Sequence, residues 1–338
     1  MSSSALGPLI VGFDGLTLDA ETSDRLLHPV VGGVILFSRN YASPTQLREL
    51  TAAIKALREP QLLITVDQEG GRVQRMKSGF TPLPPLAVLG RWYRSRPDRA
   101  NDLAYRHGRV MAAELLEHGV DLSWSPVLDL DRGSGVIGDR AMSDDPAAVV
   151  ELANFYVAGL HDAGMAACAK HFPGHGSVAA DTHTDVVTDP RPISALEDDL
   201  VPFRELAAKV QAVMMAHVKY PCRDDQPAGF SRQWIGECLR GEMGFDGLVV
   251  SDDLDMAGAG PAGPVTERLA RALEAGCDLA LVCDPRSAAA LLDQNPIAPA
   301  LDCKRLSTLY GRPMASLEEQ RTVPEFRAWR DSLEALTG

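Results

Sequence analysis

The chain has 338 residues, of which 45% are hydrophobic, and this supplies a large folded core and excludes disorder as the main state. Its 46 acidic residues outnumber its 33 basic ones, so the net charge is -13 at pH 7. Nucleic acids and anionic membranes both favour positively charged proteins, so the composition argues against either as a general partner. We therefore expect a soluble protein that binds neither nucleic acid nor membranes.

The six cysteines and the N-terminus indicate where the protein resides. No two cysteines form a CxxC pair, and no Cys/His spacing is typical of a zinc site. Cysteines of this kind are typical of small buried residues in a reducing compartment. Residues 1–7 lack the basic and apolar regions of a signal peptide, and no stretch approaches the roughly 18 apolar residues of a membrane span. We expect a cytoplasmic protein.

Eight short runs along the chain are typical of β-strands. They are apolar throughout rather than alternating, as strands buried on both faces should be. The runs span residues 9–12, 31–37, 62–66, 120–124, 165–169, 212–216, 247–251 and 277–282.

Helical segments are predicted between most of these strands. Ser43, Asp145 and Ser194 stand where a helix N-cap is expected, and Gly164 and Gly276 stand where a helix should end. Alternating strands and helices imply a parallel sheet with right-handed crossovers. We therefore predict an α/β protein: one (β/α)8 TIM-barrel catalytic domain over residues 1–338, with a C-terminal helical segment from about residue 296. A doubly wound sheet is the alternative, although no GxGxxG motif follows the first strand.

Polar residues gather directly after several of the predicted strands. In a barrel, functional side chains lie at the carboxyl ends of the strands. The third strand leads into VDQEGGRVQR at 66–75, the fifth into KHFPGHG at 170–176 with D-T-H at 181–183, and the seventh into SDD at 251–253. Several such strand ends together predict one shared site.

These motifs resemble those of glycoside hydrolase family 3, and in particular the bacterial cytoplasmic β-N-acetylglucosaminidases (β-hexosaminidases) of peptidoglycan recycling. The resemblance extends over roughly residues 7–283 and includes GPLIVGFDG, HPVVGGVILFSRNY and LRGEMGFDGLVVSDDL. It implies an exo-acting, retaining enzyme that removes terminal non-reducing β-linked N-acetylglucosamine from 1,6-anhydro-muropeptides. We expect a monomer whose partner is this sugar substrate, with no cofactor and no metal.

A retaining glycosidase needs a carboxylate that attacks the anomeric carbon and an acid/base that protonates the leaving oxygen. Asp252 follows a uniformly apolar strand that can aim it into the barrel mouth. Strand direction alone does not distinguish Asp252 from Asp253; the resemblance selects Asp252 as the nucleophile. We interpret Asp253 and Asp255 as helix caps or as members of a structural ion pair.

The expected acid/base is His183, with Asp181 orienting its ring. A carboxylate two residues away can accept a hydrogen bond from one imidazole nitrogen and favour the protonated ring. Spacing alone would indicate only an exposed loop, and the resemblance implies the catalytic role. We also expect Gly174 and Gly176 to make a pliant loop that moves His183 when sugar binds.

Five further side chains are predicted to contact the sugar. Lys170 and His171 can donate to its hydroxyl groups, and the resemblance assigns contacts to Asp67, Arg75 and Arg140. Asp67 can accept from two vicinal hydroxyls, and the arginines can bind hydroxyls or hold Asp67 in place. The competing interpretation is a structural salt-bridge cluster around the barrel mouth.

Four nearby residues receive no substrate role. Glu69 and Arg72 stay unassigned, because the salt-bridge interpretation competes most strongly there. His175 and His217 are interpreted as structural histidines rather than ligands.

Three other functions fit parts of the pattern. A metal-dependent amidohydrolase barrel would use several of the histidines, but such a site requires an HxH pair on the first strand, which here ends in Phe13-Asp14-Gly15. A non-catalytic sugar-binding barrel would have lost the chemistry, although Asp181, His183 and Asp252 are all present. A β-N-acetylglucosaminide phosphorylase stays open as the alternative within the enzyme class, since a neutral histidine base admits phosphate where a carboxylate would repel it.

Overall fold

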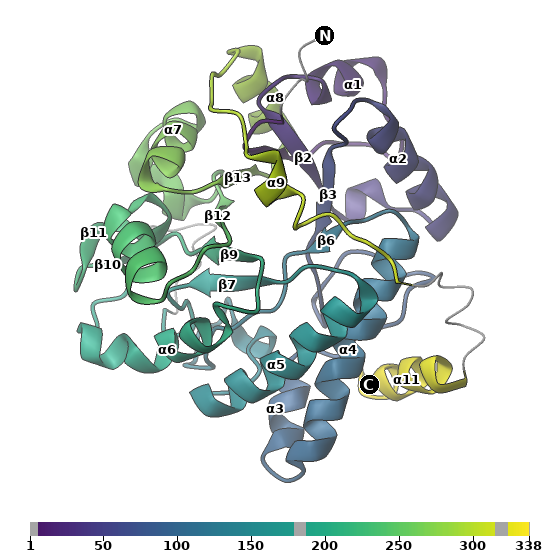
Figure 1. Ribbon diagram of the computed structural model, residues 1–338, viewed down its shortest axis with the longest axis vertical. Helices are drawn as coiled ribbons and strands as arrows, with labels where there is room; N and C mark the ends of the chain where they lie inside the picture. Colours follow the sequence, from purple (N-terminus) through teal and green to yellow (C-terminus); the bar gives the residue numbers. More distant parts are fainter. Residues whose placement is uncertain (1–5, 179–186, 315–323, 338) are drawn as a thin grey trace.

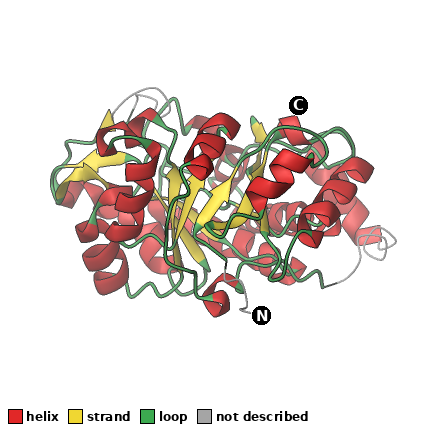
Figure 2. Cartoon of the chain, turned by 90° about the horizontal axis from the view of Figure 1, so that it is seen from above, coloured by secondary structure: helices red, strands yellow, loops and turns green. Residues whose placement is uncertain are grey.

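The computed structural model describes residues 6–178, 187–314 and 324–337. Its centre is an eight-stranded parallel sheet surrounded by helices (Figures 1 and 2). The strands follow the order β6-β3-β2-β1-β13-β12-β9-β7 around the sheet. They are β1 (Leu9–Val11), β2 (Val31–Leu36), β3 (Leu63–Val66), β6 (Leu122–Ser123), β7 (Cys168–Phe172), β9 (Ala212–Met215), β12 (Leu248–Asp253) and β13 (Leu279–Val282). All eight predicted strands are confirmed.

The sheet closes on itself between β6 and β7. Here the chain just after β6 takes the place of a longer strand: the amides of Cys168 and Lys170 donate to the carbonyls of Ser125 and Pro126, at 2.7 and 3.1 Å. The amide of Leu128 donates in return to the carbonyl of Lys170, at 2.7 Å. The structure is therefore the predicted (β/α)8 barrel rather than a doubly wound sheet.

A helical segment follows every barrel strand, as the crossover rule requires. At α2 the side chain of Ser43 accepts from the amide of Gln46, and at α5 Asp145 accepts from the amide of Ala147; both predicted N-caps are confirmed. The helices are α1 (Ala20–Leu26), α2 (Pro44–Ala56), α3 (Ala87–Tyr93), α4 (Pro97–Glu117), α5 (Pro146–Ala163), α6 (Ile193–Leu206), the helical segment η4 (Gln233–Glu242), α7 (Val265–Ala275) and α8 (Pro285–Asp293).

The prediction for the start of α6 was wrong. The helix begins at Ile193 with Pro192 at its N-cap and no side-chain cap, so Ser194 lies within the first turn. Proline restricts φ, here −66°, to a value that suits an N-cap, but it offers no side-chain acceptor to the amides of the first turn. By contrast, Gly164 and Gly276 end α5 and α7 with φ of 94° and 116°, as expected for left-handed C-cap positions.

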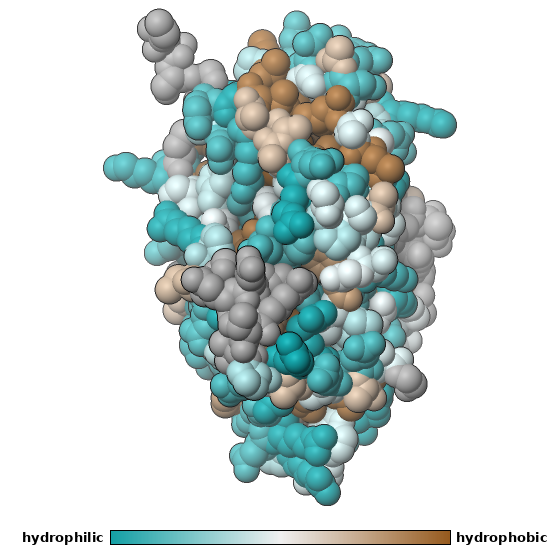
Figure 3. Space-filling view, turned by 90° about the vertical axis from the view of Figure 1, so that its right-hand side faces the viewer, coloured by the Kyte–Doolittle hydropathy of each residue, from teal (hydrophilic) through white to brown (hydrophobic). Residues whose placement is uncertain are grey.

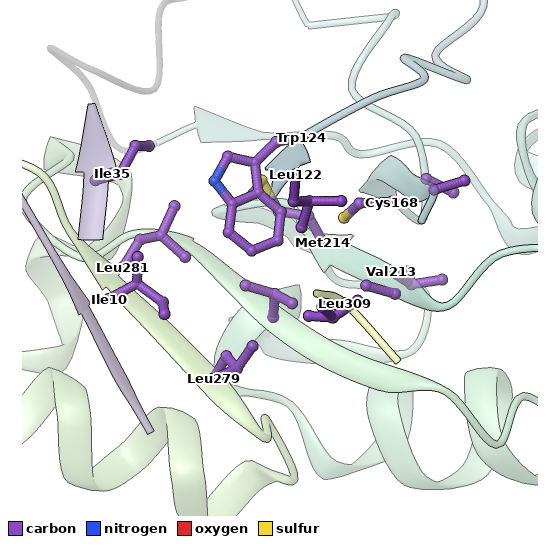
Figure 4. Close-up of a cluster of buried hydrophobic side chains, with 14 of the residues drawn as sticks. Ile10, Ile35, Leu122, Trp124, Cys168, Val213, Met214, Leu279, Leu281 and Leu309 are labelled. Atoms are coloured by element: carbon purple, nitrogen blue, oxygen red, sulfur yellow. The ribbon is translucent and has the colours of Figure 1, made fainter. Parts of the chain in front are cut away.

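Large apolar side chains fill the inside of the barrel (Figure 4). Trp124, at the end of β6, is fully buried and lies among side chains from several strands. Leu309, from the segment that follows α9 (Cys303–Leu306), joins the same cluster. The labelled members are Ile10, Ile35, Leu122, Trp124, Cys168, Val213, Met214, Leu279, Leu281 and Leu309. This packing makes the barrel interior a solid base for a site at its mouth.

Smaller elements decorate the barrel. One small sheet has two strands, β4 (Gln68–Gly70) and β5 (Val73–Gln74). Another has three strands, β8 (Val187–Thr188), β10 (Val218–Tyr220) and β11 (Asp224–Pro227), with β10 in the middle. Short helical turns are η1 (Ser38–Asn40), η2 (Gly138–Arg140), η3 (Ala228–Phe230) and η5 (Ala257–Ala262).

The last helix, α11 (Pro324–Glu334), packs against α4 through the buried side chains of Phe326 and Leu333 (Figure 1). The face of the molecule in Figure 3 is largely hydrophilic, with its apolar side chains gathered mainly towards one end. Within the described residues, no helix is both long and apolar enough to cross a lipid bilayer.

Candidate active site

A pocket of about 740 Å³ opens at the carboxyl ends of the barrel strands. Its walls come from β7, β9, β12 and β13 and from the segments after β2, β3, β6 and β13, which is where a barrel is expected to carry its chemistry. Six of the predicted site residues line it together: Asp67, Arg75, Arg140, Lys170, His171 and Asp252. The fold therefore brings these six residues, from distant parts of the sequence, to one place.

A network of buried charges forms one wall of the pocket. Lys170 Nζ lies 2.8 Å from Asp67 Oδ1 and 2.6 Å from Glu69 Oε1. Arg140 donates two hydrogen bonds to the same Glu69 carboxylate, from Nε to Oε2 at 2.7 Å and from Nη2 to Oε1 at 2.8 Å. Arg75 completes the network from the rim, with its Nη2 3.8 Å from Asp67 Oδ2.

Glu69 is the centre of this network, since Lys170 and Glu69 are both only 2% exposed. Burial alone would raise the pKa of Glu69, but the adjacent Arg140 and Lys170 outweigh that effect and hold the pKa well below its usual range. The carboxylates of Asp67 and Glu69 keep the pKa of Lys170 above its usual value, although burial alone would lower it. Glu69, Arg140 and Lys170 are therefore charged at neutral pH, and their contacts hold Asp67 and Arg140 in fixed orientations.

Asp129 is a residue that sequence reasoning missed. It follows the irregular segment that closes the barrel, it is buried, and its Oδ2 lies 2.6 Å from His171 Nδ1. Its other oxygen accepts from the amides of His171 and His175, at 3.3 and 2.7 Å. Since a carboxylate can only accept here, Nδ1 of His171 carries a proton. Its other ring nitrogen, Nε2, lies 3.5 Å from Nη2 of Arg140, and both residues line the pocket.

Asp252 is the second-to-last residue of strand β12 and lines the pocket. Its Oδ1 accepts a hydrogen bond of 2.8 Å from the amide of Asp253, and its carbonyl oxygen lies 3.1 Å from His217 Nε2. The carboxylate is thus held by the backbone of its own strand, in a residue that lines the same pocket as the charged network.

Asp253 has a different environment from its neighbour. Its Oδ1 accepts from the amides of Asp255 and Cys283, at 3.1 and 3.0 Å, and so ties β12 to the end of β13. Burial, reinforced by the negative charges of Asp255 and Asp252, raises the pKa of Asp253 to about 7. Asp253 is therefore largely neutral under mildly acidic conditions.

We expect Asp253→Asn to flatten the pH dependence of stability. The folded-state pKa lies above the unfolded value, so the stability that the neutral carboxyl contributes is complete below pH 4 and is lost as the pH rises towards 7. Asparagine cannot ionise and keeps an oxygen that accepts from both amides. The free energy of unfolding of the variant should therefore increase relative to that of the wild type as the pH rises, by at most about 4 kcal/mol. Urea unfolding at pH 4.5 and pH 8 measures this, with the exposed Asp246→Asn as control; equal pH slopes in all three proteins would contradict it.

Two predicted residues, Asp181 and His183, lie outside the described residues. The described ends of their loop are tightly packed rather than open. A Cβ on Gly176 would lie 1.8 Å from the carbonyl oxygen of Leu130, and one on Gly174 would lie 2.8 Å from Cβ of Asp199. Close packing thus requires these two glycines, and the expected movement of the loop stays a prediction.

The comparisons with known proteins agree with this geometry. The N-terminal domain of glycosyl hydrolase family 3 matches residues 9–302. A β-hexosaminidase of Alkalilimnicola ehrlichii is 52% identical over 98% of this chain and 96% of its own, and one of Thiobacillus denitrificans is 53% identical over 95% and 92%. The crystal structure of NagZ from Neisseria gonorrhoeae in complex with N-trifluoroacetyl-D-glucosamine superposes with a TM-score of 0.91 at 41% identity, covering 99% of both chains.

A barrel with this charged pocket at its mouth and these relatives is that of a glycoside hydrolase. The chain belongs to glycosyl hydrolase family 3, within the group whose relatives of about 50% identity over most of the chain are β-hexosaminidases. The amidohydrolase interpretation is thereby replaced.

Proposed function

We propose that the protein is an exo-acting, retaining β-N-acetylglucosaminidase that removes terminal non-reducing β-linked N-acetylglucosamine. The observation that carries the proposal is the Asp252 carboxylate at the end of β12, in one pocket with the network of Asp67, Glu69, Arg140 and Lys170. Further support comes from the family and from a neighbour crystallised with an N-acylated glucosamine.

In the first step, Asp252 attacks the anomeric carbon while His183, protonated and oriented by Asp181, gives its proton to the leaving oxygen. The bond to the leaving group breaks as the ester bond to Asp252 forms. In the second step, His183 takes a proton from water, and this water displaces Asp252 from the same carbon. Two inversions return the β configuration to the released sugar, and neither step requires a cofactor.

The charged wall is suited to hold the hydroxyl groups of the sugar. Asp67 supplies acceptor oxygens, and Arg75, Arg140 and Lys170 supply donors. With its ring proton on Nδ1, His171 supplies a further acceptor at Nε2, rather than the donor expected from the sequence. Because Asp129 fixes the tautomer of His171, the Nε2 atom can meet the sugar without rearrangement. A site already ordered before binding loses little entropy when the substrate arrives.

The natural substrate we propose is a 1,6-anhydro-muropeptide, cleaved in the cytoplasm by a monomeric enzyme during peptidoglycan recycling. This part rests on the resemblance of the VDQEGGRVQR, KHFPGHG and SDD motifs to that branch of the family. Purified muropeptide fragments, assayed beside the synthetic substrate below, test it.

An aryl β-N-acetylglucosaminide should be hydrolysed with release of the β anomer, and the matching glucoside should be a poor substrate. Early-time proton NMR follows the anomer, because mutarotation is slow enough to distinguish the first product. The α anomer first, or a preference for the glucoside, would contradict the proposal. The assay is run with and without phosphate, since release of the sugar 1-phosphate would indicate the phosphorylase instead.

A further inference from the structure

The peptide group between Asp252 and Asp253 is held at both of its polar atoms. Its carbonyl oxygen lies 3.1 Å from Nε2 of His217, and its N–H donates to Asp252 Oδ1 at 2.8 Å. A trans peptide is planar, so its C=O and N–H point in opposite directions and cannot turn independently. A bond that fixes the carbonyl therefore also fixes the N–H that holds the Asp252 carboxylate.

His217 itself is firmly held. Its ring stacks on Phe230 with 5.2 Å between ring centroids and 15° between ring planes. A Cβ added to Gly229 would lie 3.2 Å from ring atoms Cε1 and Nδ1, so the backbone of Gly229 packs closely against the ring. The amide of the preceding Ala216 donates to the carbonyl of Phe172 at 2.8 Å, which ties this segment to β7. The ring thus has little freedom to leave the Asp252 carbonyl.

The chemistry of the ring defines a single donor. A carbonyl only accepts, so Nε2 carries the proton in this hydrogen bond. Burial lowers the pKa of His217, although the nearby Asp252 opposes that effect, and Arg268 is a further charge close to it. The imidazole is therefore neutral, and its Nδ1 has no hydrogen-bond partner among the described residues. The single N–H of the neutral ring is therefore at Nε2, where it donates to the carbonyl oxygen of Asp252.

We propose that His217 is a positioning residue for the reaction: through the Asp252–Asp253 peptide it fixes the orientation of the Asp252 carboxylate. This inference rests on the proposed role of Asp252 as nucleophile. His217 does not line the pocket, so its effect should fall on the formation of the glycosyl-enzyme rather than on sugar binding.

The test compares His217→Phe, which keeps a ring against Phe230 but has no donor, with His217→Gln, which restores an N–H donor. We expect kcat of H217F to fall about tenfold with KM nearly unchanged, and H217Q to recover most of the loss; tenfold corresponds to about 1.4 kcal/mol. The direct readout is the rate at which 5-fluoro-N-acetylglucosaminyl fluoride labels the intact enzyme, followed by mass spectrometry with mapping of the labelled peptide.

The outcomes separate this inference from the proposed function. Label on Asp252 that forms slowly in H217F and faster in H217Q supports the inference. Label on Asp252 at equal rates in the wild type and H217F, or equal slowing in both variants, overturns the inference and leaves the proposed function intact. Label on another residue overturns both. If H217F does not fold, Phe230→Leu keeps the donor and loosens the ring; labelling should then be several-fold slower, and an unchanged rate overturns the inference.

Discussion

Replacing Asp252 with alanine should lower kcat by about 10⁴-fold or more, a loss typical for removal of a catalytic nucleophile. In the proposed mechanism no glycosyl-enzyme can form without this carboxylate, and water would have to attack the anomeric carbon directly. The wall that contains Asp67, Glu69 and Lys170 is untouched, so binding of N-acetylglucosamine should persist. Steady-state kinetics and calorimetric titration of the sugar measure the two effects.

The matched control is Asp255→Asn. Asp255 lies three residues further along the chain and accepts a hydrogen bond of 3.2 Å from the amide of Asp284, and it does not line the pocket. Activity of this variant should stay within a few-fold of the wild type. An Asp252→Ala enzyme that retains a tenth of the activity, or a wild type that binds sugar without turnover, would contradict the proposed mechanism.

Substituting Glu69 with glutamine should lower the free energy of unfolding by about 3–5 kcal/mol, because Arg140 and Lys170 would then share a buried site without their central anion. Since the pKa of Glu69 in the fold lies below its ordinary value, the stability it contributes is present above that ordinary pKa and is lost as the pH falls into the acid range. Urea unfolding at pH 7 measures the change.

An exposed ion pair in the same motif provides the comparison. Arg72 and Asp139 lie 3.3 Å apart with side chains 50% and 46% exposed, so Arg72→Ala should cost no more than about 1 kcal/mol. Equal losses in the Glu69 and Arg72 variants would mean that burial of Glu69 contributes nothing beyond an ordinary surface pair. Steady-state kinetics of the Glu69 variant provide a second readout. Its KM should rise, because the side chains of Asp67 and Arg140 would no longer be held in fixed orientations.

The barrel could be predicted from the sequence because its strands are apolar on both faces. The same reasoning misjudged where β7 and β12 end, since it stopped at the first charged residues. Lys170 and Asp252 in fact lie within strands. Charged side chains can lie within strands here because other strands supply oppositely charged or hydrogen-bonding partners at the mouth of the barrel. A local sequence pattern does not show which partners the other strands will supply.

The shared pocket could be predicted from polar residues at strand ends, but its internal organisation could not. Asp129 follows a short apolar run with no motif around it, and its contact with His171 spans 42 positions of the chain. Glu69 and Arg140 are 71 positions apart. The hydrogen-bonding capacity of these residues is visible in the sequence, whereas the choice of partner depends on how the barrel closes.

The pairing of charges in the pocket bears on how substrate arrives. Its described lining contains five acidic side chains (Asp67, Glu69, Asp252, Asp253 and Asp284) and five basic ones (Arg39, Arg72, Arg75, Arg140 and Lys170), although Asp253, with its pKa raised to about 7, is only partly ionised at neutral pH. Opposite charges so close together cancel beyond roughly a Debye length, about 8 Å at physiological ionic strength. Although the protein has a net charge of -13, the described lining of the pocket is thus almost electroneutral, and it provides no long-range electrostatic steering for the N-acetylglucosamine end of a substrate.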